Sequence, residues 1–226
     1  MGKVYIVGIG PGSPKYLTDK AKEAIKGADV VVAWDESSSY ELKTIERLTE
    51  GKKLYLQNGE NFVKVYEEVA QEYRGKDTNI ALIITGDPCI SSGIKHLTRI
   101  FKEFDIEVIS GISSVQIAAA LARISLEESA VISFHYHGEV ELEEKMKELL
   151  ELFKRGRHII ALTGEVTPNE IAEYLMSKGV DGKTQVLVCE NLTLSDEKIF
   201  RGTLNQIRDK KFSPLSVSVI INPKKQ

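Results

Sequence analysis

The sequence predicts an α/β fold built from two α/β domains. Short apolar runs, typical of buried strands, alternate with amphipathic or alanine-rich stretches, typical of helices, along the whole chain of 226 residues. A Gly/Ser turn and a small-residue helix between residues 110 and 123 separate this alternation into two sets. We therefore expect an N-terminal α/β domain over residues 1–112 and a C-terminal one over residues 113–226.

The first set of elements begins with the apolar run at residues 4–7, which Gly8 ends. A helix is expected at residues 18–27, because Thr18 can cap it and its alanines share a face with Ile25. The run at residues 80–84 is continuously apolar, which favours a parallel strand buried on both faces. The other expected strands are at 30–33, 53–56 and 107–109, and the other expected helices at 40–49, 62–73 and 92–103.

The second set continues the alternation with equally clear boundaries. Thr167 and Glu170 form a capping-box sequence with Pro168 in the first turn, so a helix is expected to begin there. A second capping box is expected at residues 203–206. Strands are expected at 130–134, 158–162, 185–189 and 216–221, and further helices at 115–122 and 140–153. The Lys/Glu-rich helix near residues 139–154 is expected to present a solvated face.

Composition excludes several classes of protein. A net charge of -3 gives no bulk attraction for nucleic acid. No stretch approaches the ~20 apolar residues of a membrane-spanning helix, and the N-terminus lacks the features of a signal peptide. Cys89 and Cys189 have no neighbouring Cys or His at zinc-site spacing and are expected to be reduced thiols. These features predict a soluble, cytoplasmic protein.

The first candidate site is the loop Gly10-Pro11-Gly12, which follows the first strand. Ligands in α/β folds bind at the carboxyl ends of strands, where this loop is expected to lie. A dinucleotide fingerprint would need a third glycine where Ser13 stands, and Pro11 lacks the N–H that a pyrophosphate would accept. The pattern therefore disfavours an NAD-dependent oxidoreductase and leaves open a structural turn or a loop that binds another ligand.

Two later loops have the same placement after a predicted strand. Asp87 lies in Thr85-Gly86-Asp87-Pro88, where its carboxylate could bind a ribose or an amino group, or cap the next helix. Ser113 and Ser114 lie in a Gly/Ser turn, where N–H groups and hydroxyls could bind a carboxylate or cap a helix. Because the three preceding strands are expected to be neighbours, the three loops should converge on one crevice.

These three loops, in this order, resemble the tetrapyrrole methylase family. The resemblance covers essentially the whole chain and implies two α/β domains with S-adenosylmethionine bound in the cleft between them, usually in a homodimer. The segments Cys189-Glu190-Asn191-Leu192, Gly202-Thr203-Leu204 and Phe212-Ser213-Pro214-Leu215 resemble the branch that methylates carbon 5 of cobalt-precorrin-7 in cobalamin synthesis. The chain ends soon after Ile221, so a separate protein is expected to supply the carbon-15 methylation and decarboxylation.

The resemblance also implies roles for individual residues. The implied cofactor contacts are Ile9, Asp87, Ile90, Ser113, Ser114, Leu162, Thr163 and Asn191. The implied contacts on the tetrapyrrole side are Gly10, Pro11, Gly12 and Glu190. The product would be S-adenosylhomocysteine, and no protein-bound metal is expected because cobalt would arrive inside the substrate.

His135 and His137 are the candidate catalytic residues. On a strand their spacing would place both on one face, and histidine suits proton transfer near neutral pH. An ordinary polar strand end is the other interpretation. The transfer itself is an in-line displacement that needs positioning rather than a covalent nucleophile. Lys15, Arg123 and Arg157 are candidate cations for the acidic groups of a corrinoid.

Four alternatives remain at this point. The acceptor could be another tetrapyrrole, or a modified histidine on a protein, as in diphthine synthase, which shares the architecture. The glycine-rich turn leaves an NAD-dependent oxidoreductase as an alternative from a different class. A binding module without catalytic activity is the fourth.

Overall fold

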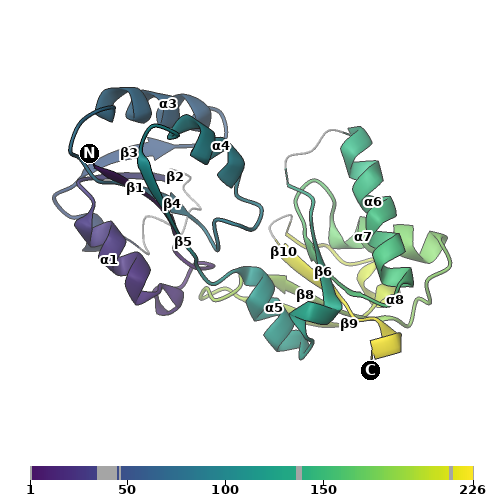
Figure 1. Ribbon diagram of the computed structural model, residues 1–226. Coiled ribbons are helices and arrows are strands. Elements are labelled where there is room, and N and C mark those ends of the chain that lie inside the picture. Colours follow the sequence, from purple (N-terminus) through teal and green to yellow (C-terminus); the bar gives the residue numbers. More distant parts are fainter. Residues whose placement is uncertain (1, 35–44, 46, 136–138, 214–215, 226) are drawn as a thin grey trace. The chain divides into compact units, whose positions relative to one another are not determined.

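The computed structural model describes residues 2–34, 45, 47–135, 139–213 and 216–225 (Figure 1). The chain forms two compact units, Met1–Ser113 and Ser114–Gln226, which we call the N-terminal and C-terminal units. Each has its own sheet and core. The helix expected at residues 40–49 lies mostly outside the described residues.

The N-terminal unit contains a sheet of five parallel strands in the order β3-β2-β4-β1-β5. The strands are β1 (Lys3–Gly8), β2 (Val30–Trp34), β3 (Lys53–Gln57), β4 (Ile80–Ile84) and β5 (Asp105–Ile109). The helices are α1 (Asp19–Gly27), α3 (Phe62–Tyr73) and α4 (Ile94–Ile100), with a short 3-10 helix η1 (Pro14–Tyr16) before α1. The two predicted capping and packing features of α1 are confirmed, since the Thr18 hydroxyl accepts a hydrogen bond from the Ala21 N–H at 3.2 Å and Ile25 is buried.

Both faces of this sheet are covered by helices, as the apolar run in β4 predicted. Ile80 and Leu82 pack in one core with side chains of α3 and α4, whereas Ala81 and Ile83 pack in a second core with side chains of α1. Figure 1 shows α3 and α4 on one side of the sheet and α1 on the other. The alternation of strand side chains between two faces therefore accounts for a continuously apolar sequence.

Helix α4 is shorter than the predicted span of residues 92–103. Ser91 has a φ of 53° and Gly93 a φ of 65°, both in the left-handed region that does not continue a right-handed helix. The helix begins only at Ile94 and has no side-chain cap at its start. The preceding loop, which contains Asp87, is accordingly longer than the sequence suggested.

The C-terminal unit contains a mixed five-stranded sheet in the order β6-β7-β10-β8-β9. Only β6 and β7 pair in parallel, and the other pairs are antiparallel. The strands are β6 (Ser129–Ser133), β7 (His158–Leu162), β8 (Gln185–Glu190), β9 (Lys198–Thr203) and β10 (Ser216–Ile220). The helices are α5 (Ser114–Ala122), α6 (Glu139–Lys154), α7 (Pro168–Ser177) and α8 (Leu204–Ile207), with 3-10 turns η2 (Leu126–Glu128) and η3 (Pro223–Lys225).

Helices α6 and α7 bury their apolar sides against one face of this sheet, and α5 packs against β7, β8 and β10. The capping box of α7 is present as predicted, with Glu170 accepting from the Thr167 N–H at 2.7 Å. Strand β9 was not predicted, because its residues are all at least partly exposed and show no apolar run. It is held in the sheet by its antiparallel pairing with β8 alone.

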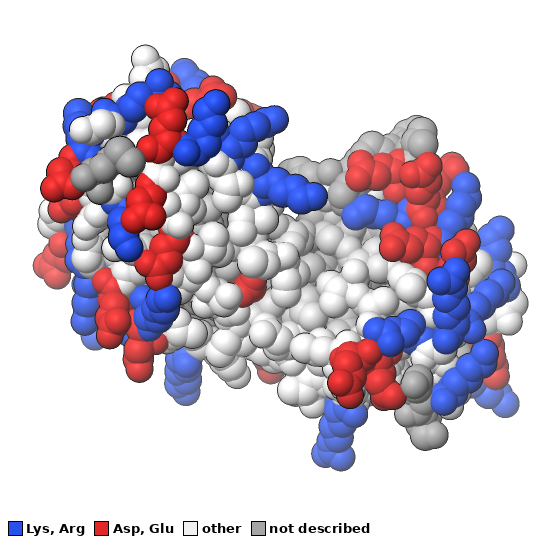
Figure 2. Space-filling view, in the orientation of Figure 1, with Lys and Arg blue, Asp and Glu red and all other residues white. Residues whose placement is uncertain are grey.

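Helix α6 shows the solvated face that its composition predicted. Leu149 is fully buried, while Lys147 and Glu143 form an exposed pair at 3.9 Å. Figure 2 shows acidic and basic side chains intermixed over this helix. No helix among the described residues combines the length and the apolar character needed to cross a bilayer.

Candidate functional site

Three loops of the N-terminal unit meet at the carboxyl-terminal edge of its sheet. Their strands β4, β1 and β5 are neighbours, as predicted. The Gly86 N–H donates to the Gly10 carbonyl oxygen at 2.8 Å, and the Gly10 N–H donates to the Gly86 carbonyl oxygen at 3.3 Å. These two hydrogen bonds join the first loop to the second, as the predicted convergence requires.

Glycine is required where these loops touch, because their backbones are in direct contact. A Cβ on Gly8 would lie 2.6 Å from the Gly111 nitrogen and 2.7 Å from the Gly86 carbonyl oxygen. A Cβ on Gly111 would clash with the same Gly86 oxygen. These distances are shorter than van der Waals contact, so any side chain at Gly8 or Gly111 would push the loops apart.

Asp87 joins two of the three loops through its side chain. One carboxylate oxygen, Oδ1, accepts the Cys89 N–H at 2.7 Å, and the other, Oδ2, accepts the Gly111 N–H at 3.0 Å. The side chain is buried, with the residue only 8% exposed. Asp87 therefore does not cap α4, which was the structural alternative, but holds its own loop against the turn at Gly111.

Gly86 is less tightly packed than Gly8 and Gly111, and the implied cofactor contacts differ in their exposure. This glycine has a φ of 73°, and a Cβ there would meet nothing closer than the Ser113 Cα at 3.8 Å. The side chain of Ile9 is only 1% exposed and belongs to the core behind the loops, so it can offer a ligand only its backbone. Ile90 is partly exposed, and Ser114 is the first residue of α5 in the C-terminal unit.

The Gly10-Pro11-Gly12 loop differs from a dinucleotide-binding turn. Gly10 and Gly12 have φ values of 84° and 140°, which L side chains rarely adopt. Ser13 caps the 3-10 helix η1, accepting the Lys15 N–H at 3.4 Å, and the first α-helix begins only at Asp19. A pyrophosphate would need the N-terminus of an α-helix directly after this turn, so the structure disfavours the NAD interpretation.

The C-terminal unit has a corresponding edge, where β6, β7 and β8 end and β10 begins. Leu162 pairs with Val217, and Glu190 pairs with Ser216. The Phe134 N–H donates to the Leu162 carbonyl oxygen at 2.9 Å, which places the end of β6 beside the end of β7. The predicted residues at the ends of β6, β7 and β8 therefore lie along one edge.

Polar side chains at this edge bind other protein groups. The Thr163 hydroxyl is fully buried and lies 2.7 Å from the Ser216 carbonyl oxygen and 2.8 Å from its hydroxyl. Glu190 accepts the Ser213 N–H at 2.6 Å, and the Asn191 amide donates to Asp196 at 2.7 Å. Thr163 thus fixes β7 to β10, and Glu190 and Asn191 shape the loops on either side.

The strand argument for the two histidines is wrong for His135, and His137 lies outside the described residues. Strand β6 ends at Ser133, and His135 lies in the bend that follows, where alternation of side chains no longer applies. Its N–H donates to the Ser133 hydroxyl at 3.3 Å. Its ring lies against Gly164, where a Cβ would be 2.8 Å from the imidazole Nδ1.

The three predicted cations lie in different places. Arg157 donates to the Ser129 carbonyl oxygen at 2.9 Å, at the amino end of β6 and so at the edge opposite His135. Lys15 is exposed in η1, and Arg123 follows α5 with a φ of 57°. Lys145, which the sequence analysis missed among the many charges of α6, donates to the Ser133 carbonyl oxygen at 2.7 Å.

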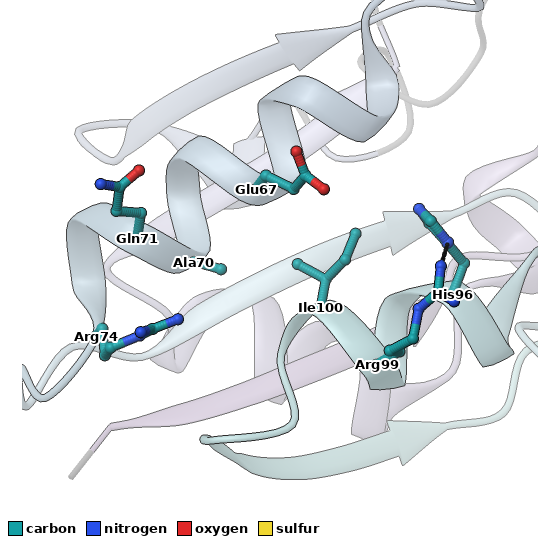
Figure 3. Close-up of a pocket in the computed structure, with 7 residues that line it drawn as sticks. All are labelled: Glu67, Ala70, Gln71, Arg74, His96, Arg99 and Ile100. Atoms are coloured by element: carbon teal, nitrogen blue, oxygen red, sulfur yellow. Dashed lines mark hydrogen bonds between the residues drawn. The ribbon is translucent and has the colours of Figure 1, made fainter.

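A pocket of about 410 Å³ lies elsewhere in the N-terminal unit, between α3 and α4 (Figure 3). It shares no residue with the three loops. Its arginines already have protein partners, since Arg74 lies 3.0 Å from Glu103 and Arg99 lies 2.9 Å from the His96 Nδ1. The described residues contain no cluster of three or more His, Cys, Asp or Glu that could hold a metal ion. The strand-end loops remain the candidate site.

Comparison with known proteins agrees with this geometry. Residues 3–208 match the family of Tetrapyrrole (Corrin/Porphyrin) Methylases. A probable cobalt-precorrin-7 C(5)-methyltransferase of Methanocaldococcus jannaschii is 41% identical over 96% of both chains. The crystal structure of a precorrin-6Y methylase from Archaeoglobus fulgidus is 26% identical, with a TM-score of 0.73 over 99% of this chain and 100% of that one. The crystal structure of the methyltransferase CobJ is 17% identical, with a TM-score of 0.80 over 99% and 95%.

The chain belongs to the tetrapyrrole methylase family. Its predicted fold of two α/β domains is confirmed. It is an S-adenosylmethionine-dependent C-methyltransferase. The three strand-end loops of the N-terminal unit, which we call the N-terminal edge, suit that cofactor chemically, because main-chain groups and small polar residues can bind its amino, carboxylate and hydroxyl groups.

Proposed function

We propose that this enzyme methylates carbon 5 of cobalt-precorrin-7 during synthesis of the cobalamin ring. The observation that supports the proposal most directly is the identity, over nearly the full length of both chains, with the Methanocaldococcus jannaschii protein of that probable activity. In both units, glycine and small polar residues lie where the strands end. This is consistent with a methyltransferase that acts mainly by positioning the methyl donor against the acceptor carbon.

In this proposal the N-terminal edge binds the methyl donor. S-adenosylmethionine supplies an electrophilic methyl group on a sulfonium, and the protein has only to hold it in line with the ring carbon. Asp87 keeps the loops together, and Ile90, Ser113 and Ser114 are proposed to contact the cofactor.

The edge of the C-terminal unit where β6, β7 and β8 end, which we call the C-terminal edge, contains residues proposed to contact the tetrapyrrole and the adenine of the cofactor. Leu162, Thr163 and Asn191 are proposed cofactor contacts. The Thr163 hydroxyl is buried and bonded to β10, so its side chain is proposed to support the site by holding β7 to β10. Glu190 is proposed on the substrate side, together with the loop Gly10-Pro11-Gly12 of the N-terminal unit. His135, together with His137, is proposed to handle the proton that the methylated carbon loses.

The test combines cofactor binding with identification of the product. Calorimetry should show S-adenosylhomocysteine binding, and a dissociation constant weaker than ~100 μM would contradict the cofactor assignment. Incubation with cobalt-precorrin-7 and methyl-labelled S-adenosylmethionine should place one labelled methyl group at carbon 5, as read by NMR. A label on another ring carbon would reject the substrate while keeping the class of reaction.

Other acceptors are separated by the same assay. Transfer to a different precorrin would indicate another tetrapyrrole methylase, and transfer to a modified histidine on a protein would indicate an activity like diphthine synthase. The identity with a precorrin-7 enzyme favours the corrin acceptor. A separate protein is proposed to carry out the carbon-15 methylation and decarboxylation.

We further propose that the enzyme is a cytoplasmic homodimer. Both cysteines are free thiols in the structure, which is consistent with a reducing compartment. Light scattering on the purified protein would measure the oligomeric state, and a monomer at micromolar concentration would reject the dimer.

A further inference from the structure

We propose that Lys145 binds a carboxylate of the tetrapyrrole at the carboxyl-terminal edge of the C-terminal sheet, an inference that rests on the proposed function. The Nζ of Lys145 lies 2.7 Å from the carbonyl oxygen of Ser133, the last residue of β6. The lysine therefore reaches from α6 to the same edge that carries His135, Thr163 and Glu190.

Ser133 connects Lys145 to His135. Its carbonyl oxygen accepts from the Lys145 ammonium, and its hydroxyl accepts from the His135 N–H at 3.3 Å. The cation and the proposed proton-handling residue are thus both held at the last residue of one strand. A substrate acid group bound by Lys145 would therefore be held at the strand end that His135 follows.

The charge on Lys145 has no protein counter-ion in the described part of the chain. Elsewhere on α6, Lys147 lies 3.9 Å from Glu143, and just beyond the helix Arg155 lies 4.0 Å from Glu151. No ion pair among the described residues involves Lys145, although α6 is rich in glutamate. An ammonium has three N–H donors, and the Ser133 oxygen accepts one of them.

A carboxylate ligand would complete the hydrogen bonding of this ammonium. Lys145 is partly buried, so it has lost part of its hydration, and the Ser133 carbonyl oxygen replaces only part of that loss. A carboxylate placed there would form charge-assisted hydrogen bonds in surroundings less polar than water. Arg157 cannot serve this edge, because it is bound at the opposite end of β6.

The experiment compares Lys145→Gln with Lys147→Gln, a matched change on the same helix at a lysine paired with Glu143. For cobalt-precorrin-7, Lys145→Gln should raise KM about 10-fold, the loss expected for one charge-assisted hydrogen bond. Lys147→Gln should leave KM unchanged. Both variants should keep wild-type affinity for S-adenosylhomocysteine, and added salt should raise KM for wild type more than for Lys145→Gln.

A second measurement separates this inference from the proposed function. Binding of uroporphyrin, a fluorescent tetrapyrrole polycarboxylate, should be about 10-fold weaker in Lys145→Gln than in wild type or Lys147→Gln. Equal affinities in all three proteins, or no binding to wild type, would overturn the role of Lys145. Parallel losses of thermal stability and of S-adenosylhomocysteine affinity would also overturn it, because they would indicate a purely structural cap on Ser133. Failure of wild type to methylate cobalt-precorrin-7 would reject the proposed function instead.

Discussion

The two units build their strand-end edges by different means. In the N-terminal unit, backbone meets backbone at Gly8, Gly86 and Gly111, and one buried carboxylate ties the loops together. In the C-terminal unit, side-chain hydrogen bonds hold the strand ends and loops together. They are the contact between the Thr163 and Ser216 hydroxyls and the contacts of Glu190 and Lys145. A backbone-built edge tolerates few substitutions, whereas a side-chain edge can be altered one contact at a time. We therefore expect changes at Gly111 and Asp87 to affect folding and cofactor binding together, and changes at Gly164 and Lys145 to affect the substrate step.

The largest effect is expected from Gly111→Ala in the N-terminal unit. The new Cβ would clash with the Gly86 carbonyl oxygen, and backbone on both sides leaves little room to relax. We expect a loss of about 3 kcal/mol in the free energy of unfolding, at the upper end for overpacking, together with loss of S-adenosylhomocysteine binding. Urea unfolding and calorimetry would measure both.

Gly27→Ala is the control for that change, because a Cβ there meets nothing within 4 Å. Its unfolding free energy should stay within about 1 kcal/mol of wild type. If Gly111→Ala behaved like Gly27→Ala, the loops would be able to separate freely, and the contrast between the two edges would not hold.

The next largest effect is expected from Asp87→Asn. An amide in place of the carboxylate turns an NH₂ group toward either the Cys89 or the Gly111 N–H, so one buried donor loses its acceptor. The expected cost is about 1–3 kcal/mol in unfolding free energy, with a weaker affinity for S-adenosylhomocysteine.

Asp196→Asn provides the comparison in the C-terminal unit. Asp196 is exposed and accepts from Asn191, so its replacement should change stability by less than about 0.5 kcal/mol. Equal losses of stability from the two substitutions in thermal unfolding would remove the distinction between a buried carboxylate that joins two loops and an exposed carboxylate.

A selective effect is expected from Gly164→Ala in the C-terminal unit. Its Cβ would lie 2.8 Å from the Nδ1 of His135, a side-chain atom that can move aside. Displacing the imidazole should lower kcat about 10-fold with cobalt-precorrin-7, because small shifts of a positioned group are costly to the rate. The affinity for S-adenosylhomocysteine should not change. A matching drop in cofactor affinity would show that His135 does not act in the substrate step.

The sequence predicted the parts of this molecule that depend on local patterns. The apolar run of β4, the cap at Thr18 and the glycine turns were sufficient to expect neighbouring strands and converging loops. Partnerships between distant residues were not predictable. Asp87 was expected to contact a ligand or cap a helix, but its bond to Gly111 depends on the order of the strands. Lys145 was not predicted, because the sequence around it does not distinguish it from the other charged residues of α6 or show that it reaches Ser133.

The smallest effect uses the two thiols as reporters, one in each unit. Cys89 is exposed between Asp87 and Ile90, and partial desolvation and the Asp87 carboxylate raise its pKa. Cys189 is buried in β8, and burial raises the pKa of its thiol to about 12. Iodoacetamide reacts with the thiolate, so at pH 8 Cys89 should be modified slowly and Cys189 not at all until the protein unfolds. Because Cys89 lies in the proposed cofactor loop, S-adenosylhomocysteine should slow its modification further, as read by mass spectrometry. If saturating S-adenosylhomocysteine left the modification rate of Cys89 unchanged, the cofactor would lie away from the Asp87 loop. The N-terminal edge would then not be the site that binds the methyl donor.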